Sequence, residues 1–387
     1  MAARIFYLDR FRFLVVTFAI MSHVISKHNV MQTALADTMV YLRIVTRTAT
    51  PSLLILLGIM VTIVYVPRFM QEPRVAANKI LKRTLQCYVA FLVIVLVGLL
   101  VGMHDTHRAL RAVLFLNQVS QGTIFQLYVL LLPVAIGLIW VQLRLGPLWL
   151  GLLAFLIWVA EPLVAAVVLP AGLAELGSVM IGYGNWWGPS AYHGISLVAF
   201  GMLVGNALAP QSSQAVRRQS MIAVAVLLAG AAAVLAAEAL AHGPRFVASS
   251  IVHSGRYRWH NELPYFAFGV IGAVMLLAVS WFLSKAFSPR TFAIPDRIGR
   301  FTLTYFLIGE ILILTLPGPT LDRYATLLPT LVFYVSAAGL LAISAQHIMT
   351  AFLNRHAPAR PAQSPVSEAS SESTQYNPVA VGKASRP

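Results

Sequence analysis

Arg12 and His23, near the N-terminus, are the two residues whose types and spacing best fit chemistry inside a membrane. An ideal helix turns by about 1100° between these positions, which is three turns plus about 20°, and rises by roughly 16.5 Å. Both side chains therefore share one face. Because the apolar core of a bilayer is about 30 Å thick, an arginine at its edge places His23 near the midplane. An ionisable group at that depth indicates function, whereas a topology-setting arginine and an interfacial Ser22-His23 pair are the structural alternatives.

Lys79, Lys82 and Arg83 form a second cluster whose spacing indicates binding. They follow one another at i, i+3 and i+4, so they lie on one face at the start of a helix. On the cytoplasmic side, this face can hold the phosphates of lipid headgroups, which is the commoner use of such a face. It can also hold the phosphates of a nucleotide-bearing donor such as coenzyme A. The sequence leaves both alternatives open.

The elements that must position these residues are membrane helices. Hydrophobic residues make up 58% of the chain and charged residues 11%, against about 25% charged residues in an average soluble domain. The mean hydropathy is +0.77. Long uncharged runs of this kind span bilayers, so the chain is predicted to be an all-α, polytopic integral membrane protein. The expected transmembrane helices, about ten, cover 8–28, 47–67, 84–103, 123–143, 147–169, 190–209, 219–241, 264–285, 301–319 and 325–350.

The positive charge of the chain sets its expected orientation. The net charge is +15, but the cations lie between apolar runs, which favours topology anchors over a nucleic-acid surface. No nucleic-acid partner is therefore predicted. Lys and Arg are more frequent in the loops that share a side with the N-terminus, so both termini are expected in the cytoplasm. On this assignment Arg144 and Arg218 face the cytoplasm, and Arg108 faces the opposite side.

Residues 1–353 are expected to form one transmembrane domain. Residues 354–387 are rich in Pro, Ala, Ser and Gln and almost free of large apolar side chains, which predicts a disordered cytoplasmic tail. The single cysteine, Cys87, excludes an intrachain disulfide and a cysteine-based metal cluster. His104 and His107 are weak indications of a metal ligand set, so no metal site is predicted.

The opening Tyr7-Leu8-Asp9-x-x-Arg12, followed by His23, resembles the first membrane helix of the acyltransferase 3 family of integral-membrane acyltransferases. Two later segments are also similar to that family. Thr50 to Gly58 is an apolar span with a small-residue break, and Asn78 to Arg83 is a basic entry to the third helix. The motif-level resemblance covers residues 7–23 and, less closely, 50–83.

The family pattern is incomplete in the later helices. His and Trp are missing around Gln126-Leu127-Tyr128, and the histidine expected after Leu303–Leu307 is missing too, with Gly309-Glu310 in its place. Three carboxylates fall inside apolar runs, at Glu161, Glu238 and Glu310. Of these, Glu310 lies where the family keeps a polar group, so the resemblance makes it the expected partner of His23. The alternative is a neutral glutamic acid that hydrogen-bonds to a neighbouring helix.

The resemblance implies an enzyme, an acyltransferase that transfers groups other than amino-acyl groups. An acetyl or succinyl group would move from a cytoplasmic acyl-CoA donor to a hydroxyl of an extracytoplasmic or lipid-linked glycan, in the bacterial cytoplasmic (inner) membrane. Acyl-CoA would be a substrate, and no permanently bound cofactor is expected. The implied catalytic residues are His23, Arg12 and Glu310, and the implied donor-binding residues are Arg12, Lys79, Lys82 and Arg83. Asp9 is expected to hold Arg12 in place, and His23 can serve either as a general base or as an acylated nucleophile.

A proton-coupled membrane transporter or flippase is the alternative class. About ten spans, buried glutamates and a midplane histidine suit proton-coupled movement of a substrate. The sequence shows no internal repeat and no matching pair of Gly/Pro-broken helices, which argues against this class. A non-catalytic membrane sensor is a third class, and it leaves His23 without a task.

Overall fold

The computed structural model describes residues 5–355 apart from 34, 36–38, 120, 185–188, 253–254 and 289. Helices account for all regular structure in the described residues, which confirms the predicted all-α class. The principal helices are α1 (Phe6–Lys27), α2 (Val40–Arg47), α3 (Ala49–Met60), α4 (Val66–Gln71), α5 (Pro73–Leu100), α7 (Thr123–Leu145), α8 (Pro147–Val159), α11 (Ala191–Leu208), α12 (Gln214–His242), α15 (Leu263–Ala286), α17 (Thr302–Thr315) and α18 (Tyr324–Arg355). Shorter helices are α6 (Thr106–Val113), α9 (Glu161–Ala165), α10 (Ala174–Ile181), α13 (Pro244–Val252), α14 (Arg256–Trp259) and α16 (Ala293–Ile298).

Eight helical segments within the described residues are long and apolar enough to cross a membrane. They are Val40–Gln71, Pro73–Leu100, Thr123–Leu145, Ala191–Leu208, Gln214–His242, Leu263–Ala286, Ala293–Thr315 and Tyr324–Phe352. The chain is therefore a multi-pass membrane protein by length and composition of its helices.

Two further spans expected from the sequence, 8–28 and 147–169, are not among these eight segments. The run 8–28 corresponds to α1, which has 22 residues but carries Asp9, Arg10 and Arg12 in its first two turns. The run 147–169 is divided, because α8 ends after 13 residues and α9 begins at Glu161. Pro162 cannot donate a backbone hydrogen bond to the preceding turn, which favours a helix boundary there.

The helical segment from α2 to α4 contains a bulge with an identifiable cause. Val61–Tyr65 forms a π-helical turn between α3 and α4. Pro67, in the first turn of α4, has no N–H for the carbonyl of Ile63 one turn earlier. Gln211 donates to that carbonyl instead, at 3.3 Å. A side chain from a neighbouring connection therefore satisfies the backbone group that the proline frees.

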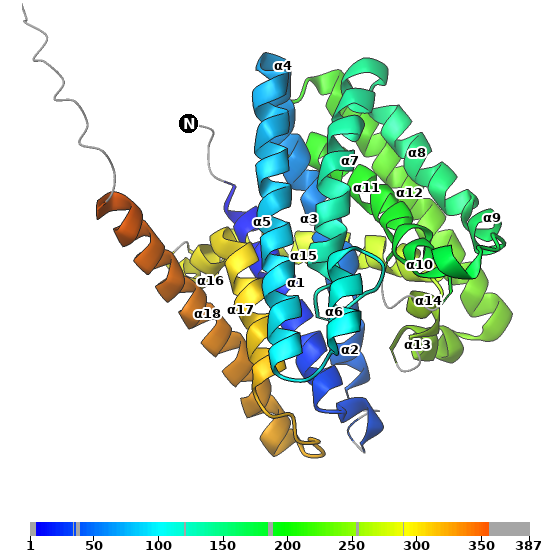
Figure 1. Ribbon diagram of the computed structural model, residues 1–387. Coiled ribbons are helices and arrows are strands. Elements are labelled where there is room, and N and C mark those ends of the chain that lie inside the picture. Colours follow the sequence, from blue (N-terminus) through cyan, green and yellow to red (C-terminus); the bar gives the residue numbers. More distant parts are fainter. Residues whose placement is uncertain are drawn as a thin grey trace, which may run out of the picture. The chain divides into compact units, whose positions relative to one another are not determined.

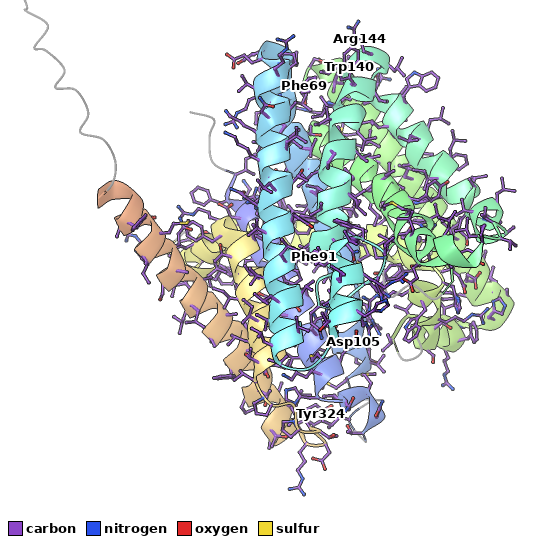
Figure 2. All side chains as sticks on the ribbon, in the orientation of Figure 1. Phe69, Phe91, Asp105, Trp140, Arg144 and Tyr324 are labelled. Atoms are coloured by element: carbon purple, nitrogen blue, oxygen red, sulfur yellow. The ribbon has the colours of Figure 1, made fainter. Side chains whose placement is uncertain are left out.

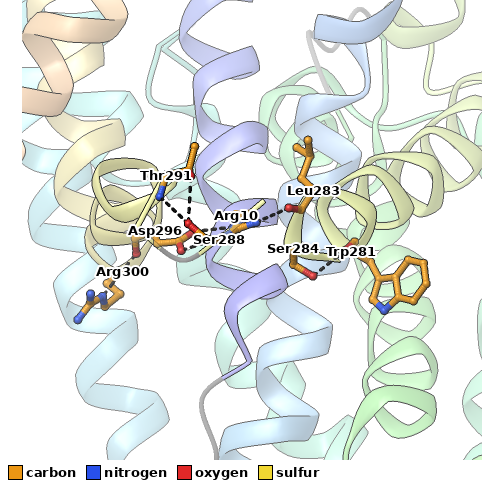
Figure 3. A network of polar contacts seen from close by, with 8 residues as sticks. All are labelled: Arg10, Trp281, Leu283, Ser284, Ser288, Thr291, Asp296 and Arg300. Atoms are coloured by element: carbon orange, nitrogen blue, oxygen red, sulfur yellow. Dashed lines mark hydrogen bonds and ion pairs between the residues drawn. The ribbon is translucent and has the colours of Figure 1, made fainter. Parts of the chain in front are cut away.

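Helix α1 packs against α3, α15 and α17 (Figure 1) and is fixed at both ends. At its start, the buried Arg10 donates to Asp296 of α16 at 3.0 Å and to the carbonyl of Leu283 at 2.6 Å (Figure 3). At its end, the Lys27 ammonium donates to the carbonyls of Ile313 and Leu316, which terminate α17. The axial position of every side chain on α1 is thereby fixed relative to α15, α16 and α17.

The connections between the long helices lie at two opposite ends of the helices. In Figure 2, Phe69 and Arg144 lie at one end, whereas Asp105 and Tyr324 lie at the other. The sequence assigned the loops that contain Arg144 and Arg108 to opposite sides of the membrane. The position of Asp105, three residues before Arg108, agrees with that alternation.

Contacts between Cα atoms divide the chain into one unit of residues Met1–Gln346 and a second of His347–Pro387. The first unit contains every residue predicted to take part in function. Of the tail predicted for 354–387, residues 356–387 lie outside the described residues.

Candidate active site

Five cations line one cavity of about 440 Å³. Arg12 comes from α1, Lys79, Lys82 and Arg83 come from the first three turns of α5, and Arg300 comes from the short η4 turn (Gly299–Phe301) before α17. The four predicted donor-binding cations are thus brought together although Arg12 is far from the others in the sequence. No Asp or Glu is among the described residues that line the cavity. Like charges gathered without lining carboxylates make the cavity suited to a polyanion.

Beyond the cations, the cavity wall is apolar. Val16 of α1, Leu53 and Leu57 of α3, and Phe125 and Phe306 of α7 and α17 contribute to it. Tyr128 also lines this part, and its hydroxyl donates to the carbonyl of Leu53 at 2.7 Å. A ligand with a charged end and a long, weakly polar arm matches this division of the cavity.

Arg12 is held in the orientation that the sequence suggested. Its Nη1 donates to Asp9 Oδ1 at 3.1 Å, one turn earlier on α1, and its Nη2 contacts the sulfur of Met60. The Arg12 side chain retains 21% exposure, which leaves part of the guanidinium available to the cavity. Asp9 neutralises part of the charge and restricts the rotamers of Arg12.

His23 and Glu310 are in direct contact. His23 Nδ1 lies 2.7 Å from Glu310 Oε1, and the Glu310 side chain is fully buried while that of His23 is 25% exposed. Close approach of α17 to α1 is possible because Gly309 faces Ile20, where a Cβ would come within 2.6 Å of the isoleucine side chain. The carboxylate orients the ring and occupies Nδ1, which leaves Nε2 outside this contact.

The other two carboxylates in apolar runs lie elsewhere. Glu238, near the end of α12, accepts from the Tyr257 hydroxyl at 3.0 Å and contacts His242 at 3.2 Å. Glu161 starts α9 and lines neither the cavity nor the pocket described next. Among the three carboxylates, Glu310 alone meets His23.

His23 lines a second, much smaller pocket of about 10 Å³. The other lining residues are Ala19, Ser22, Thr46, Arg47, Ala49, Thr50, Arg258 and Tyr265. Thr46 and Thr50 provide hydroxyl groups, and Arg47 and Arg258 provide guanidinium groups. The pocket is therefore polar, unlike the apolar part of the larger cavity.

The two hollows follow one another along the same pair of helices. On α1, Val16 lines the cavity and Ala19 lines the pocket; on α3, Leu53 lines the cavity and Thr50 the pocket. Three residues of helix correspond to roughly 4.5 Å, so less than one turn separates them. The separation coincides with a pair of rings from α7 and α17, described next. Arg12 thus lines the cavity and His23 lines the pocket, although both belong to α1.

Phe125 and Phe306 form the partition beside His23. Their ring centroids lie 5.1 Å apart, and the Phe306 centroid lies 6.4 Å from that of His23. Both phenylalanines are almost fully buried, at 2% and 5% exposure. Phe306 thus lines the cavity and also lies beside His23.

Sequence reasoning missed Arg300, Arg47 and Arg258. It treated Arg300 and Arg47 only as loop cations that set topology, and it placed Arg258 in a polar loop expected to line the extracytoplasmic opening, without connecting it to His23. Their positions emerge only from the tertiary structure, in which η4 packs against α1 and Arg258 of α14 lines the same pocket as His23. Within the described residues, no group of three or more His, Cys, Asp or Glu side chains is arranged to hold a metal ion.

No family model, no curated protein and no solved structure matches this chain. The resemblance to the acyltransferase 3 family therefore rests on the motif residues of the sequence.

Proposed function

We propose that this protein is a membrane O-acyltransferase that uses an acyl-CoA donor. One observation carries the proposal: Arg12, Lys79, Lys82 and Arg83 line a single cavity whose apolar part runs along α1 to within one turn of the His23 pocket. The cations suit the phosphates of coenzyme A. The apolar part suits its pantetheine arm, with the thioester directed towards His23.

The proposed reaction uses His23 as the base. Nε2 takes the proton of an acceptor hydroxyl as its oxygen attacks the thioester carbonyl carbon. The new C–O bond forms, the C–S bond breaks, and the proton passes to the departing CoA thiolate. Glu310 stabilises the imidazolium between these two transfers. A relay in which His23 first takes the acyl group and then passes it to the hydroxyl also conserves all atoms, and the same geometry serves it.

The proposed acceptor is a hydroxyl of an extracytoplasmic or lipid-linked glycan, and the acyl group is acetyl or succinyl. In the proposed topology of about ten spans, both termini and the five-cation cavity face the cytoplasm of a bacterium, where acyl-CoA is available. The His23 pocket then faces the acceptor. Anionic membrane lipids near Lys79 and Lys82 are further ligands for the cavity mouth.

A proton-coupled transporter or flippase is the second candidate. The buried His23–Glu310 pair favours it, because intramembrane His and Glu side chains commonly relay protons. The five cations fit it less well, since proton movement requires no anion-binding cavity.

The deciding experiment compares glycans from cells that express wild-type protein or the His23→Ala variant at equal membrane levels. His242→Ala is the matched control, because His242 is half exposed and pairs with Glu238 away from both hollows. Mass spectrometry of periplasmic and surface glycans is expected to show an acetyl or succinyl increment that disappears only in His23→Ala. Identical glycans in wild type and His23→Ala would refute the proposal and favour the transporter.

A further inference from the structure

The His23 pocket contains two arginines that no described carboxylate neutralises. Arg47 ends α2, and Arg258 lies in α14, more than 200 positions later in the chain. The lining residues of the pocket include no Asp or Glu. Glu310, the nearest carboxylate to the ring of His23, is engaged by Nδ1. Two guanidinium groups therefore converge on the place where the proposed chemistry occurs.

The arginines also have donors without acceptors. Nε of Arg47 and Nε of Arg258 are both buried and have no hydrogen-bond partner. The Nε of the neighbouring Arg43 is likewise buried without a partner, but its Nη1 and Nη2 donate to the Ser22 carbonyl, the Ser22 hydroxyl and the Ser26 hydroxyl at 2.9–3.0 Å. Burying a charged donor without an acceptor is costly, so the arrangement is one that an incoming negative charge would stabilise.

The size of the pocket limits what that negative charge can be. A volume of about 10 Å³ has room for approximately one water-sized atom. A volume of this size favours a single oxygen atom over a phosphate or a whole carboxylate. The hydroxyl of Thr50 lines the same space, whereas the Thr46 hydroxyl donates to the Arg43 carbonyl at 3.3 Å.

We propose that Arg47 and Arg258 form the oxyanion hole of the acyl transfer. This assignment rests on the proposed function. When the acceptor oxygen attacks, the electron pair of the thioester C=O moves onto its oxygen, and the two guanidinium groups stabilise that charge. When the C=O bond re-forms, the C–S bond breaks and the thiolate leaves. The arginines touch the reacting oxygen, so both are catalytic residues.

Loss of stabilisation that develops only in the transition state lowers the maximal rate and leaves donor binding intact. Removing one oxyanion donor typically lowers kcat by about 10²–10³-fold. We therefore expect Arg47→Gln and Arg258→Gln to lower kcat by at least about 30-fold, with KM for the acyl donor changed less than about threefold. Arg47→Lys and Arg258→Lys, which keep a charged donor, should recover part of the rate.

The assay follows transfer of radiolabelled acetyl or succinyl groups from CoA thioesters to the endogenous acceptor in isolated membranes, at equal protein levels. Arg256→Gln is the matched control, because Arg256 is exposed on the same short helix and pairs with Glu262 outside the pocket. Binding of unacylated CoA to the purified proteins in nanodiscs reports folding. Unacylated CoA has no acyl carbonyl, so its affinity should be the same in all variants.

The outcomes separate this assignment from the function on which it rests. If wild-type membranes transfer no acyl group from either thioester, the proposed function fails and the oxyanion hole fails with it. If wild type is active and the Gln variants match it, or raise KM at unchanged kcat, only the oxyanion hole is refuted. Where a Gln variant does not bind CoA, its Lys variant decides: a kcat below that of wild type with retained CoA binding supports the assignment, and an unchanged kcat overturns it.

Discussion

The contact between His23 and Glu310 joins two residues 287 positions apart in sequence. Glu310 Oε1 meets His23 Nδ1 at 2.7 Å, while Glu310 Oε2 is buried without a hydrogen-bond partner. The carboxylate thus has one described contact, and that contact orients an imidazole. In the proposed reaction the negative charge counterbalances the imidazolium formed during proton transfer.

Replacing Glu310 by Gln tests that role at the residue scale. Glu310→Gln keeps the size of the side chain but removes its charge, so the imidazolium loses its counter-ion. We expect kcat for acyl transfer to fall by about 10–100-fold, less than the roughly 10²–10⁴-fold that a general base itself supplies because His23 remains, while KM for the acyl donor stays unchanged. The control is Glu238→Gln, which should retain wild-type activity in the same membrane assay. Equal activity of Glu310→Gln and wild type would assign Glu310 a structural role only.

Some of these residues follow from the sequence and others do not. The positions of Arg12 and His23 follow from helical geometry, and the Asp9–Arg12 contact follows from their separation of one turn. Arg47 and Arg258 meet only through the packing of α14 near α2, which no local pattern encodes. The pair of His23 and Glu310 was expected from the family resemblance, whereas nothing in the sequence indicated the pair of Arg47 and Arg258.

At the scale of elements, α3 and α11 approach closely enough for their backbones to touch. A Cβ on Gly201 would lie 2.0 Å from the carbonyl oxygen of Ile55, and a Cβ on Gly58 would lie 2.1 Å from that of Val198. Gly201 and Gly205 form a GxxxG pattern, which allows close packing of membrane helices. This contact fixes α3 against α11. It therefore also fixes Leu53, which lines the cavity, and Thr50, which lines the pocket.

Gly201→Ala is expected to destabilise the protein by about 3 kcal/mol, at the upper end of the cost of overpacking, because backbone atoms must move. Cys87 is fully buried and is the only cysteine of the chain, so its reaction with a thiol-reactive dye on heating reports unfolding. The labelling midpoint in detergent should shift to a lower temperature in Gly201→Ala. Gly230→Ala is the control, since no atom lies within 4 Å of that Cβ. Similar midpoints for the two variants would contradict the packing argument.

The sequence predicted most helices but not all of their boundaries. Uncharged runs identify a bilayer span by length and composition alone, which is why the eight apolar segments were anticipated. The run 147–169 was expected to be continuous, whereas α8 ends at Val159. This run contains Pro162, and only packing decides whether a proline bends a membrane helix or ends it.

At the scale of the whole molecule, orientation in the membrane decides which hollow meets which compartment. His107 and Arg218 are both exposed, on α6 and α12 respectively, and the sequence assigns them to opposite sides. In intact cells, a membrane-impermeant maleimide is expected to label His107→Cys and not Arg218→Cys. Permeabilised cells should give labelling of both. Buried Cys87 keeps the background low, and the reverse pattern would invert the proposed topology.

The aromatic partition beside His23 also bears on the energy supply of the cell. A water-filled passage from one membrane face to the other would dissipate the proton-motive force. An apolar constriction excludes water and therefore ions, and Phe125 and Phe306 close the cavity on the side of His23. Under the proposed function, an acyl group can cross at this point while the membrane stays sealed, so modification of an outer glycan requires neither export of coenzyme A nor loss of ion gradients.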